Sequence, residues 1–299
     1  MRVLISGCGY VGSALGLLLA SEGHTVFGLR RDTSALPPGI HPINADLSAP
    51  LPPGVLPEDL DAVVHTVSPG GSTDESYKTA YVDGPRNLLS ALAPRNALRR
   101  FVLVSSTGVY GQRNGEWVDE DSPTGSVSAS GLRLLEGERL VLGGAVPAVV
   151  LRLGGIYGPG RSGMIKRAFH EPPRDEDPPR YTNRIHRDDC AGALRHLLLL
   201  QDPDPIYLGV DHEPATRRTI AGWLASQPGG PLLEAVSPSP PAVRVDANET
   251  PRGASRARTN KRCSNARLVA SGYRFRYPTF REGFTALLHQ TKDGDSTSK

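Results

Sequence analysis

A glycine-rich turn near the start of the chain limits the fold more than any other feature. Residues 2–6 read RVLIS, an apolar and β-branched segment, and the next six residues read GCGYVG. Residues 13–23 then repeat apolar side chains at helical spacing, and residues 25–29, TVFGL, read as a second strand. A GxGxxG pattern between a strand and a helix predicts a βαβ unit that binds a dinucleotide.

Each glycine of the turn has its own physical reason. Gly7 permits a tight turn, Gly9 lets the backbone approach a pyrophosphate, and Gly12 lets the helix pack closely on the strand. The phosphates are then expected over the free N–H groups at the start of the helix. The candidate cofactor-binding residues of the turn are Gly7, Cys8, Gly9, Tyr10, Val11 and Gly12. The alternative is a glycine-rich turn that binds no ligand.

The residues after the second strand choose between the two nicotinamide cofactors. An NAD site usually places a carboxylate there for the ribose 2′-hydroxyl group, whereas this chain has Arg30 and Arg31. Planar guanidinium groups suit a 2′-phosphate, so we predict NADP, with Arg30 and Arg31 as cofactor-binding residues. Asp32 follows directly and keeps NAD as the alternative.

Five further strand candidates recur along the chain, with helical patterns between most of them. They span residues 39–47, 61–68, 99–107, 148–158 and 205–210. Strands that alternate with helices predict a parallel sheet, and ligands bind at the carboxyl ends of its strands. The residues at these ends are Asp46, Leu47, Thr66 to Ser68, Ser105 to Thr107 and Ile156 to Gly158. Each reads singly as an exposed turn, and together they predict one crevice.

Composition disfavours several classes of function. The 299 residues are 22% charged and 38% hydrophobic, as in globular proteins, and the early apolar run LGLLLA is too short to span a membrane. Three scattered cysteines without a CxxC pair predict neither disulfides nor a metal site. We therefore expect a cytoplasmic protein with no membrane partner. The Arg-rich residues 244–268 read as a solvated loop or the rim of an anion pocket, in preference to a nucleic-acid patch.

Seven motifs follow one another along the chain: GCGYVG, ADL, VVHTVSP, NLLSAL, VLVSSTGVYG, LRLGGIYGPGR and IHRDDCAGAL. Together they resemble the extended short-chain dehydrogenase/reductases of the NAD-dependent epimerase/dehydratase family. The resemblance implies that Ser106 is a catalytic residue whose hydroxyl group holds a substrate carbonyl. It also implies cofactor contacts from Asp46, Leu47, Val67, Ser68 and Ile156. Members of the family commonly carry GxxGxxG in place of the GxGxxG of this chain.

The expected fold is therefore α/β, a Rossmann-type doubly wound parallel sheet with a small C-terminal substrate-binding subdomain. We expect the Rossmann core at residues 1–158 and a disordered tail at 291–299. Residues 159–290 would add the remaining core strand and helices together with the subdomain. Within them, the Pro-rich and charged residues 159–186 read as a long loop over the crevice. The sequence is compatible with a homodimer and with a monomer.

The family's catalytic Tyr and Lys are missing from the expected helix. Aligning the family's YxxxK motif, often YGxSKxxxE, places Ser130 at the Tyr, Leu134 at the Lys, and Glu138 as a remnant of the pattern. None of the five lysines of the chain has a tyrosine four residues before it. In the family, the Tyr hydroxyl moves the proton and the Lys charge lowers a phenol pKa of about 10. A serine hydroxyl is a much poorer acid than a phenol. With SG in place of YG, the chain resembles the atypical members of this family.

Two functions of different classes follow. The first is an NADP-dependent oxidoreductase or epimerase for a carbonyl or nucleotide-sugar-like small molecule, with its proton donor moved to Tyr110, Tyr157 or His186. Arg161 and Arg187 would then bind a phosphorylated or nucleotide-linked substrate. The second is a catalytically silent NADP-binding sensor or regulatory protein. We favour the enzyme, because the other residues at the strand ends are intact.

Overall fold

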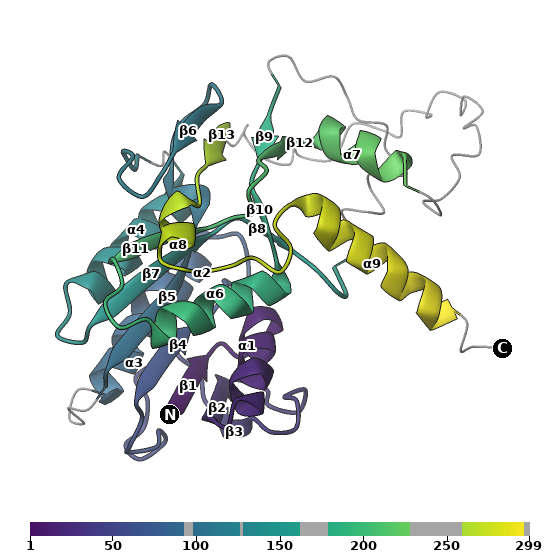
Figure 1. Cartoon of the computed structure of the whole chain (residues 1–299). Coiled ribbons are helices and arrows are strands. Elements are labelled where there is room, and N and C mark those ends of the chain that lie inside the picture. Colours follow the sequence, from purple (N-terminus) through teal and green to yellow (C-terminus); the bar gives the residue numbers. More distant parts are fainter. Residues whose placement is uncertain (93–97, 126–127, 162–178, 228–258, 296–299) are drawn as a thin grey trace, which may run out of the picture.

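A parallel sheet of seven strands lies at the centre of the molecule (Figure 1). The computed structural model describes residues 1–92, 98–125, 128–161, 179–227 and 259–295. The strands of the sheet are β1 (Arg2–Ser6), β2 (Thr25–Arg30), β3 (His41–Asn44), β4 (Ala62–His65), β5 (Arg100–Ser106), β7 (Ala148–Leu153) and β11 (Ile206–Gly209). Their order is β11-β7-β5-β4-β1-β2-β3, and all neighbours are parallel. The strand order reverses beside β1, which confirms the predicted Rossmann-type doubly wound sheet.

Helices cover both faces of this sheet (Figure 1). One face carries α1 (Tyr10–Ser21) and α6 (Arg187–Leu199), which lie against each other. The other face carries α2 (Asp74–Lys78), the π-helix η1 (Thr79–Asp83), α3 (Gly84–Leu92) and α4 (Ala129–Leu142). Alternate residues of β1 pack on opposite faces, with Val3 and Ile5 toward α1 and Leu4 toward α3. Burial on both faces explains why the strands read as continuous apolar runs.

The segment 148–158 is two strands, where the sequence pattern predicts one. β8 (Gly155–Tyr157) leaves the central sheet and pairs with β10 (Arg184–His186). The backbone changes partner between two consecutive glycines: Gly154 N–H donates to Gly209 O at 3.0 Å, whereas Gly155 N–H donates to Asn183 O at 2.8 Å. Glycine tolerates this close approach, since a Cβ atom on Gly154 would lie 2.9 Å from the Asn183 carbonyl oxygen.

The remaining elements come from residues 107–118 and from the C-terminal part of the chain, and most of them lie above the carboxyl edge of the sheet (Figure 1). They are η2 (Thr107–Val109), β6 (Glu116–Val118), β9 (Tyr181–Thr182), β12 (Ala215–Thr216), α7 (Arg217–Ala225), β13 (Lys261–Cys263), α8 (Ala266–Ala270) and α9 (Phe280–Asp295). β6 pairs with β13, and β9 pairs with β12. Helix α9 extends into the tail at 291–299 for which we expect disorder. The expected loop at 159–186 and the Arg-rich stretch at 244–268 lie partly outside the described residues.

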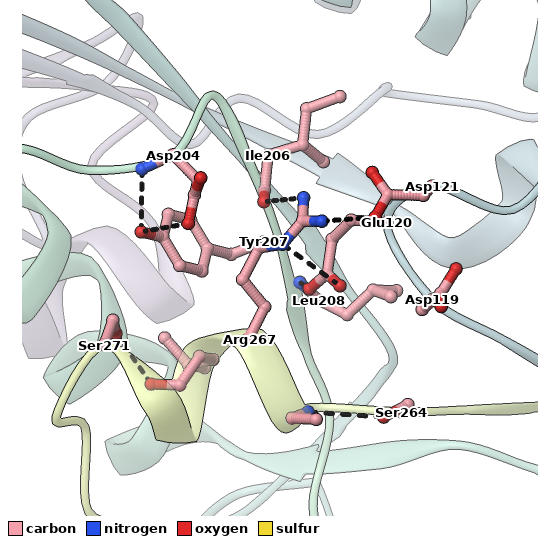
Figure 2. Close-up of polar contacts among 12 residues, drawn as sticks. Asp119, Glu120, Asp121, Asp204, Ile206, Tyr207, Leu208, Ser264, Arg267 and Ser271 are labelled. Carbon is pink, nitrogen blue, oxygen red and sulfur yellow. Dashed lines mark hydrogen bonds and ion pairs between the residues drawn. The ribbon is translucent and has the colours of Figure 1, made fainter.

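The open edge of the sheet at β11 is covered by two charged side chains (Figure 2). The buried Glu120 carboxylate accepts the Leu208 N–H group at 2.7 Å, and Arg267 Nη1 lies 3.5 Å from Ile206 O. Arg267 also bonds Asp121 at 2.6 Å. Unpaired strand edges favour aggregation, so this cover protects the sheet while it anchors α8.

No helix in the described ranges combines the length and the apolar character needed to cross a membrane.

Candidate functional site

The glycine-rich turn lies between β2 and β4 at the carboxyl edge of the sheet. Gly7 has φ +79°, and its N–H group donates to Leu29 O at 2.9 Å. A Cβ atom on Gly7 would lie 2.5 Å from the Val67 backbone nitrogen, so a larger residue does not fit. A Cβ atom on Gly12 would lie 2.9 Å from Thr66 Oγ1, which is the close helix–strand approach expected of that glycine.

The start of α1 presents backbone N–H groups without a side-chain cap. Gly9 precedes the helix, and the first turn contains no acidic residue. By contrast, Ser128 caps α4 and Thr216 caps α7 through their hydroxyl groups. Uncapped N–H groups and the helix dipole attract anions. Helix α1 can therefore hold a phosphate where these other helices use their own side chains.

Two arginines lie at the carboxyl end of β2, where Arg30 is the last residue of the strand and Arg31 follows it. Arg30 is half-buried, with Nη1 3.5 Å from Cys8 O, and Arg31 is exposed. The neighbouring Asp32 carboxylate accepts the Ser34 N–H group at 2.9 Å, and hydrogen bonding by Ser34 lowers the pKa of Asp32. The strand end thus offers two guanidinium groups beside one carboxylate that is engaged in its own turn.

The residues after β3 form a second small turn beside it. The exposed Asp46 carboxylate accepts the Ser48 N–H group at 2.9 Å, which lowers the pKa of Asp46. Leu47 is buried, and its carbonyl oxygen accepts Asn87 Nδ2–H at 3.0 Å. These bonds hold the chain in place where an adenine group is expected.

His65 connects the strand ends to the π-helix. The buried imidazole accepts the Ser6 hydroxyl at Nδ1 (2.8 Å) and donates from Nε2 to Ala80 O (3.0 Å). Burial lowers the pKa of His65 to about 4, so the ring stays neutral. Beyond His65, Val67 is half-buried and Ser68 is exposed at the edge of the sheet. The π-helix turn is thereby fixed next to these two candidate cofactor-binding residues.

Ser106 and α4 meet around Gly108. Ser106 is half-buried at the end of β5, and its Oγ accepts the Gly108 N–H group at 3.1 Å. Leu134 is 3% exposed, and its Cδ1 lies 3.8 Å from the place of a Cβ atom on Gly108. In the first turn of α4, Ser130 Oγ lies 3.2 Å from Ser128 Oγ. This corner therefore presents hydroxyl groups and an apolar side chain, with no ammonium group at position 134.

Glu138 has a structural role, which corrects its interpretation as a remnant of the family pattern. Its carboxylate pairs with Arg152 Nη2 at 2.7 Å, and both side chains are less than 5% exposed. The Ser105 hydroxyl donates to the same carboxylate at 2.5 Å, and Arg152 Nη1 donates to Tyr110 Oη at 2.7 Å. The network connects α4 to β5 and β7 beneath the Ser106 corner. Long-range packing between elements decides this role, and local sequence patterns do not contain it.

The three residues considered as relocated proton donors are all buried. Tyr110 is 0% exposed and donates to Asp119 O at 2.7 Å, and burial raises its pKa to about 12. Tyr157 is 1% exposed, lies against Phe284 of α9, and has its pKa raised by burial. His186 is 2% exposed, caps α6 through Nδ1, and has its pKa lowered to about 4 by burial. These positions suit packing and capping better than proton donation to a ligand.

The remaining candidate residues come from β8, from the 158–161 turn and from the start of α6. Ile156 is half-buried on β8, outside the central sheet. Arg161 and Arg187 both lie over the ring of Tyr10, with guanidinium carbons 4.0 and 5.4 Å from the ring centroid. The structure thus brings the 158–161 turn and the start of α6 to the glycine-rich turn.

Tyr77 is a residue that the sequence reasoning missed. It lies half-buried on α2 and packs with Val67 against the cluster that contains Leu134. Its ring is tilted against that of Tyr81, with the ring centroids 5.9 Å apart. Tyrosines four residues apart share one face of a helix. The sequence YKTAY at residues 77–81 could therefore have predicted that Tyr77 and Tyr81 lie close together. Unlike Tyr110 and Tyr157, the Tyr77 side chain is partly exposed.

A family model described as the NAD dependent epimerase/dehydratase family matches residues 3–197. Among curated proteins, a 3-diazoavenalumate denitrifying reductase from a Streptomyces species is 27% identical, over 95% of this chain and 99% of the relative.

Solved structures agree with this match. A Methylobacillus flagellatus protein, described as an NAD-dependent epimerase/dehydratase, has a TM-score of 0.75 and 35% identity over 97% of this chain and 98% of its own. A human epimerase family protein with NADPH has a TM-score of 0.69 and 22% identity over 97% of this chain and 99% of its own, which shows the shared fold.

Proposed function

The chain belongs to the NAD dependent epimerase/dehydratase family, and on this premise we propose that it is an NADP-dependent reductase that needs no tyrosine acid. Family membership confirms the resemblance drawn from the motifs and the prediction of an NAD(P)-dependent enzyme. One contrast carries the proposal: the uncapped start of α1 and the two arginines at the end of β2 are present, whereas Ser130 and Leu134 stand in place of the Tyr and Lys.

The described residues fit an NADP molecule. The N–H groups around Gly9 at the start of α1 would hold its phosphates, and Arg30 and Arg31 would hold the 2′-phosphate. The remaining cofactor contacts would come from Asp46, Leu47, Val67, Ser68 and Ile156. When bound, NADPH supplies a hydride, which is two electrons with one proton.

The protein side of the reaction then depends on the acceptor. Reduction of a carbonyl leaves an alkoxide that must gain a proton, and the side chains of Tyr110, Tyr157 and His186 are all buried. An iminium ion accepts hydride to give a neutral amine, and an aryl diazonium ion gives an arene and dinitrogen, so neither needs a proton from the protein. The Streptomyces relative is named as a reductase of a diazo compound, which supports an acceptor of this kind.

Leu134 supports the same acceptors through charge. An ammonium group at this position would repel a cationic acceptor, and the buried Leu134 side chain carries no charge. Tyr77 is half-buried, packs against the same cluster as Leu134, and has an aromatic ring that can attract a cation. Ser106 would orient the acceptor through its hydroxyl group.

A carbonyl or nucleotide-sugar-like acceptor is the second candidate, because Tyr77 is a partly exposed phenol that packs against the same cluster as Val67. One experiment distinguishes these two candidate functions. NADPH oxidation is measured with matched pairs of acceptors, an N-alkyl iminium ion against its parent ketone and an aryl diazonium ion against the aryl aldehyde with the same ring substituents, together with nucleotide sugars.

We expect turnover of the cationic member of each pair, with Tyr77→Phe as active as the parent chain. Turnover of ketones or nucleotide sugars that is lost in Tyr77→Phe would instead establish the second candidate. Tight NADPH binding without turnover of any acceptor would contradict both candidate reactions. It would instead favour the catalytically silent NADP-binding sensor.

A further inference from the structure

Three separate segments meet on the ring of Tyr10, the first residue of α1. The Arg161 guanidinium carbon lies 4.0 Å from the ring centroid, and that of Arg187 lies 5.4 Å from it. The Tyr10 hydroxyl donates to Pro159 O at 2.8 Å, which fastens the 158–161 turn to the phosphate-binding turn. Tyr10 is therefore a platform that holds two cations at the uncapped start of α1.

Positive charge exceeds negative charge around this platform. Arg187 pairs with Asp188 at 2.9 Å, and Asp188 is also 3.8 Å from Arg276. Arg161 is exposed, and within the described ranges it contacts no carboxylate. The nearby Asp189 is buried and accepts hydrogen bonds from Tyr273 and the backbone of residues 276–277. Three guanidinium groups thus share one accessible carboxylate, which leaves charge available for an anion.

A buried donor without a partner lies at the same turn. His186 Nδ1 accepts the Asp188 N–H group, so the neutral ring carries its proton on Nε2. His186 Nε2 is buried and lacks a hydrogen-bond partner among the described residues. A Cβ atom added to Gly158 would lie 3.4 Å from His186 Nε2 and 2.9 Å from the Tyr10 hydroxyl oxygen, so both polar atoms face this glycine. Buried donors are rarely left unpaired, so this turn lacks a polar group that a ligand can supply.

We propose that Arg161 and Arg187, held on Tyr10, form a clamp for the pyrophosphate of the dinucleotide. This inference rests on the proposed function, because it needs a dinucleotide at the start of α1. It reassigns Arg161 and Arg187, which the sequence pattern assigns to a phosphorylated substrate. The reason is their position: both lie on the side chain of the residue whose backbone opens the phosphate-binding helix.

The clamp predicts a distinct pattern of ligand affinity. NADPH and NADH both contain the pyrophosphate, whereas adenosine 2′-monophosphate contains only the 2′-phosphate. Arg161→Gln is expected to weaken the binding of NADPH and of NADH by the same factor, about tenfold, because one charge-assisted hydrogen bond is lost. The affinity for adenosine 2′-monophosphate is expected to stay unchanged. Arg31→Gln is expected to weaken the binding of NADPH and of adenosine 2′-monophosphate and to leave the affinity for NADH unchanged.

The test is calorimetric titration of the full chain with the three ligands. Arg113→Gln removes an exposed arginine elsewhere and serves as the matched control for total charge. Arg161→Lys keeps the charge without the planar fork, and its affinity for NADH should fall between those of the parent chain and Arg161→Gln. Thermal unfolding of Arg161→Gln and Arg161→Lys without ligand should match the parent chain, because Arg161 is exposed.

Unchanged NADH affinity in Arg161→Gln and Arg187→Gln would overturn the clamp while the proposed function stands. Weaker adenosine 2′-monophosphate binding in Arg161→Gln would also overturn it, because the arginine would then serve the 2′-phosphate. A parent chain that binds neither dinucleotide removes the clamp and the proposed function together.

Discussion

The buried pair of Glu138 and Arg152 gives the sharpest prediction about stability. In Glu138→Ala, the Arg152 guanidinium loses its carboxylate partner at 2.7 Å while it is only 4% exposed. Removal of one partner from a buried ion pair costs about 3–5 kcal/mol, because the other charge stays desolvated. The Ser105 hydroxyl loses its acceptor as well, which costs roughly 1–3 kcal/mol and overlaps with the first loss.

The assay is thermal unfolding of Glu138→Ala beside a control on the same helix. At about 2–4 °C per kcal/mol for a chain of this size, the midpoint should fall by roughly 6–20 °C. Glu136→Ala removes a carboxylate that pairs with Arg133 at 2.8 Å but is 38% exposed, and Arg133 keeps Asp74. Exposed pairs are worth about 0–1 kcal/mol, so the control midpoint should barely move. Equal losses in both variants would refute the argument from burial.

Two further predictions concern an ionisable group and a helix contact. Burial raises the pKa of Asp211 to about 8, so the folded chain keeps a proton that the unfolded chain loses near pH 4. Stability should therefore fall as pH rises from about 4 to about 8, and Asp211→Asn should flatten this dependence in urea denaturation; equal slopes would contradict it. Gly137→Ala places a Cβ atom 2.1 Å from Tyr81 O and should lower the unfolding midpoint, whereas Gly222→Ala, with open space around it, should leave the midpoint unchanged or raise it. Similar midpoints in both alanine variants would show that α4 can shift freely.

Local signals explain the part of the fold that the sequence predicted well. The segment from β1 to β2 contains strand, turn and helix patterns within thirty residues, and Gly7 and Gly12 have the conformation and close contacts expected of them. The apolar runs predicted the central strands because both faces of the sheet are buried. The break between β7 and β8 escaped prediction, since it depends on Asn183, which lies far along the chain.

The candidate site was harder to predict because its chemistry depends on burial. Tyr110 and Tyr157 have side chains that can donate a proton, and only packing shows that they are inaccessible. Glu138 matched a family pattern, yet its partner Arg152 comes from another strand. The cluster of Arg161 and Arg187 on Tyr10 likewise joins three distant segments. Sequence patterns identify residue types at strand ends, whereas these pairings arise only in the folded chain.

The most direct test of the central claim follows the hydride itself. NADPH labelled with deuterium at the transferable position is incubated with an N-alkyl iminium acceptor, and the product is analysed by mass spectrometry for the parent chain and Tyr77→Phe. The account predicts one deuterium in each product molecule at matching rates for both proteins, because no phenol takes part. Unlabelled product, or loss of transfer in Tyr77→Phe while NADPH still binds, would contradict it.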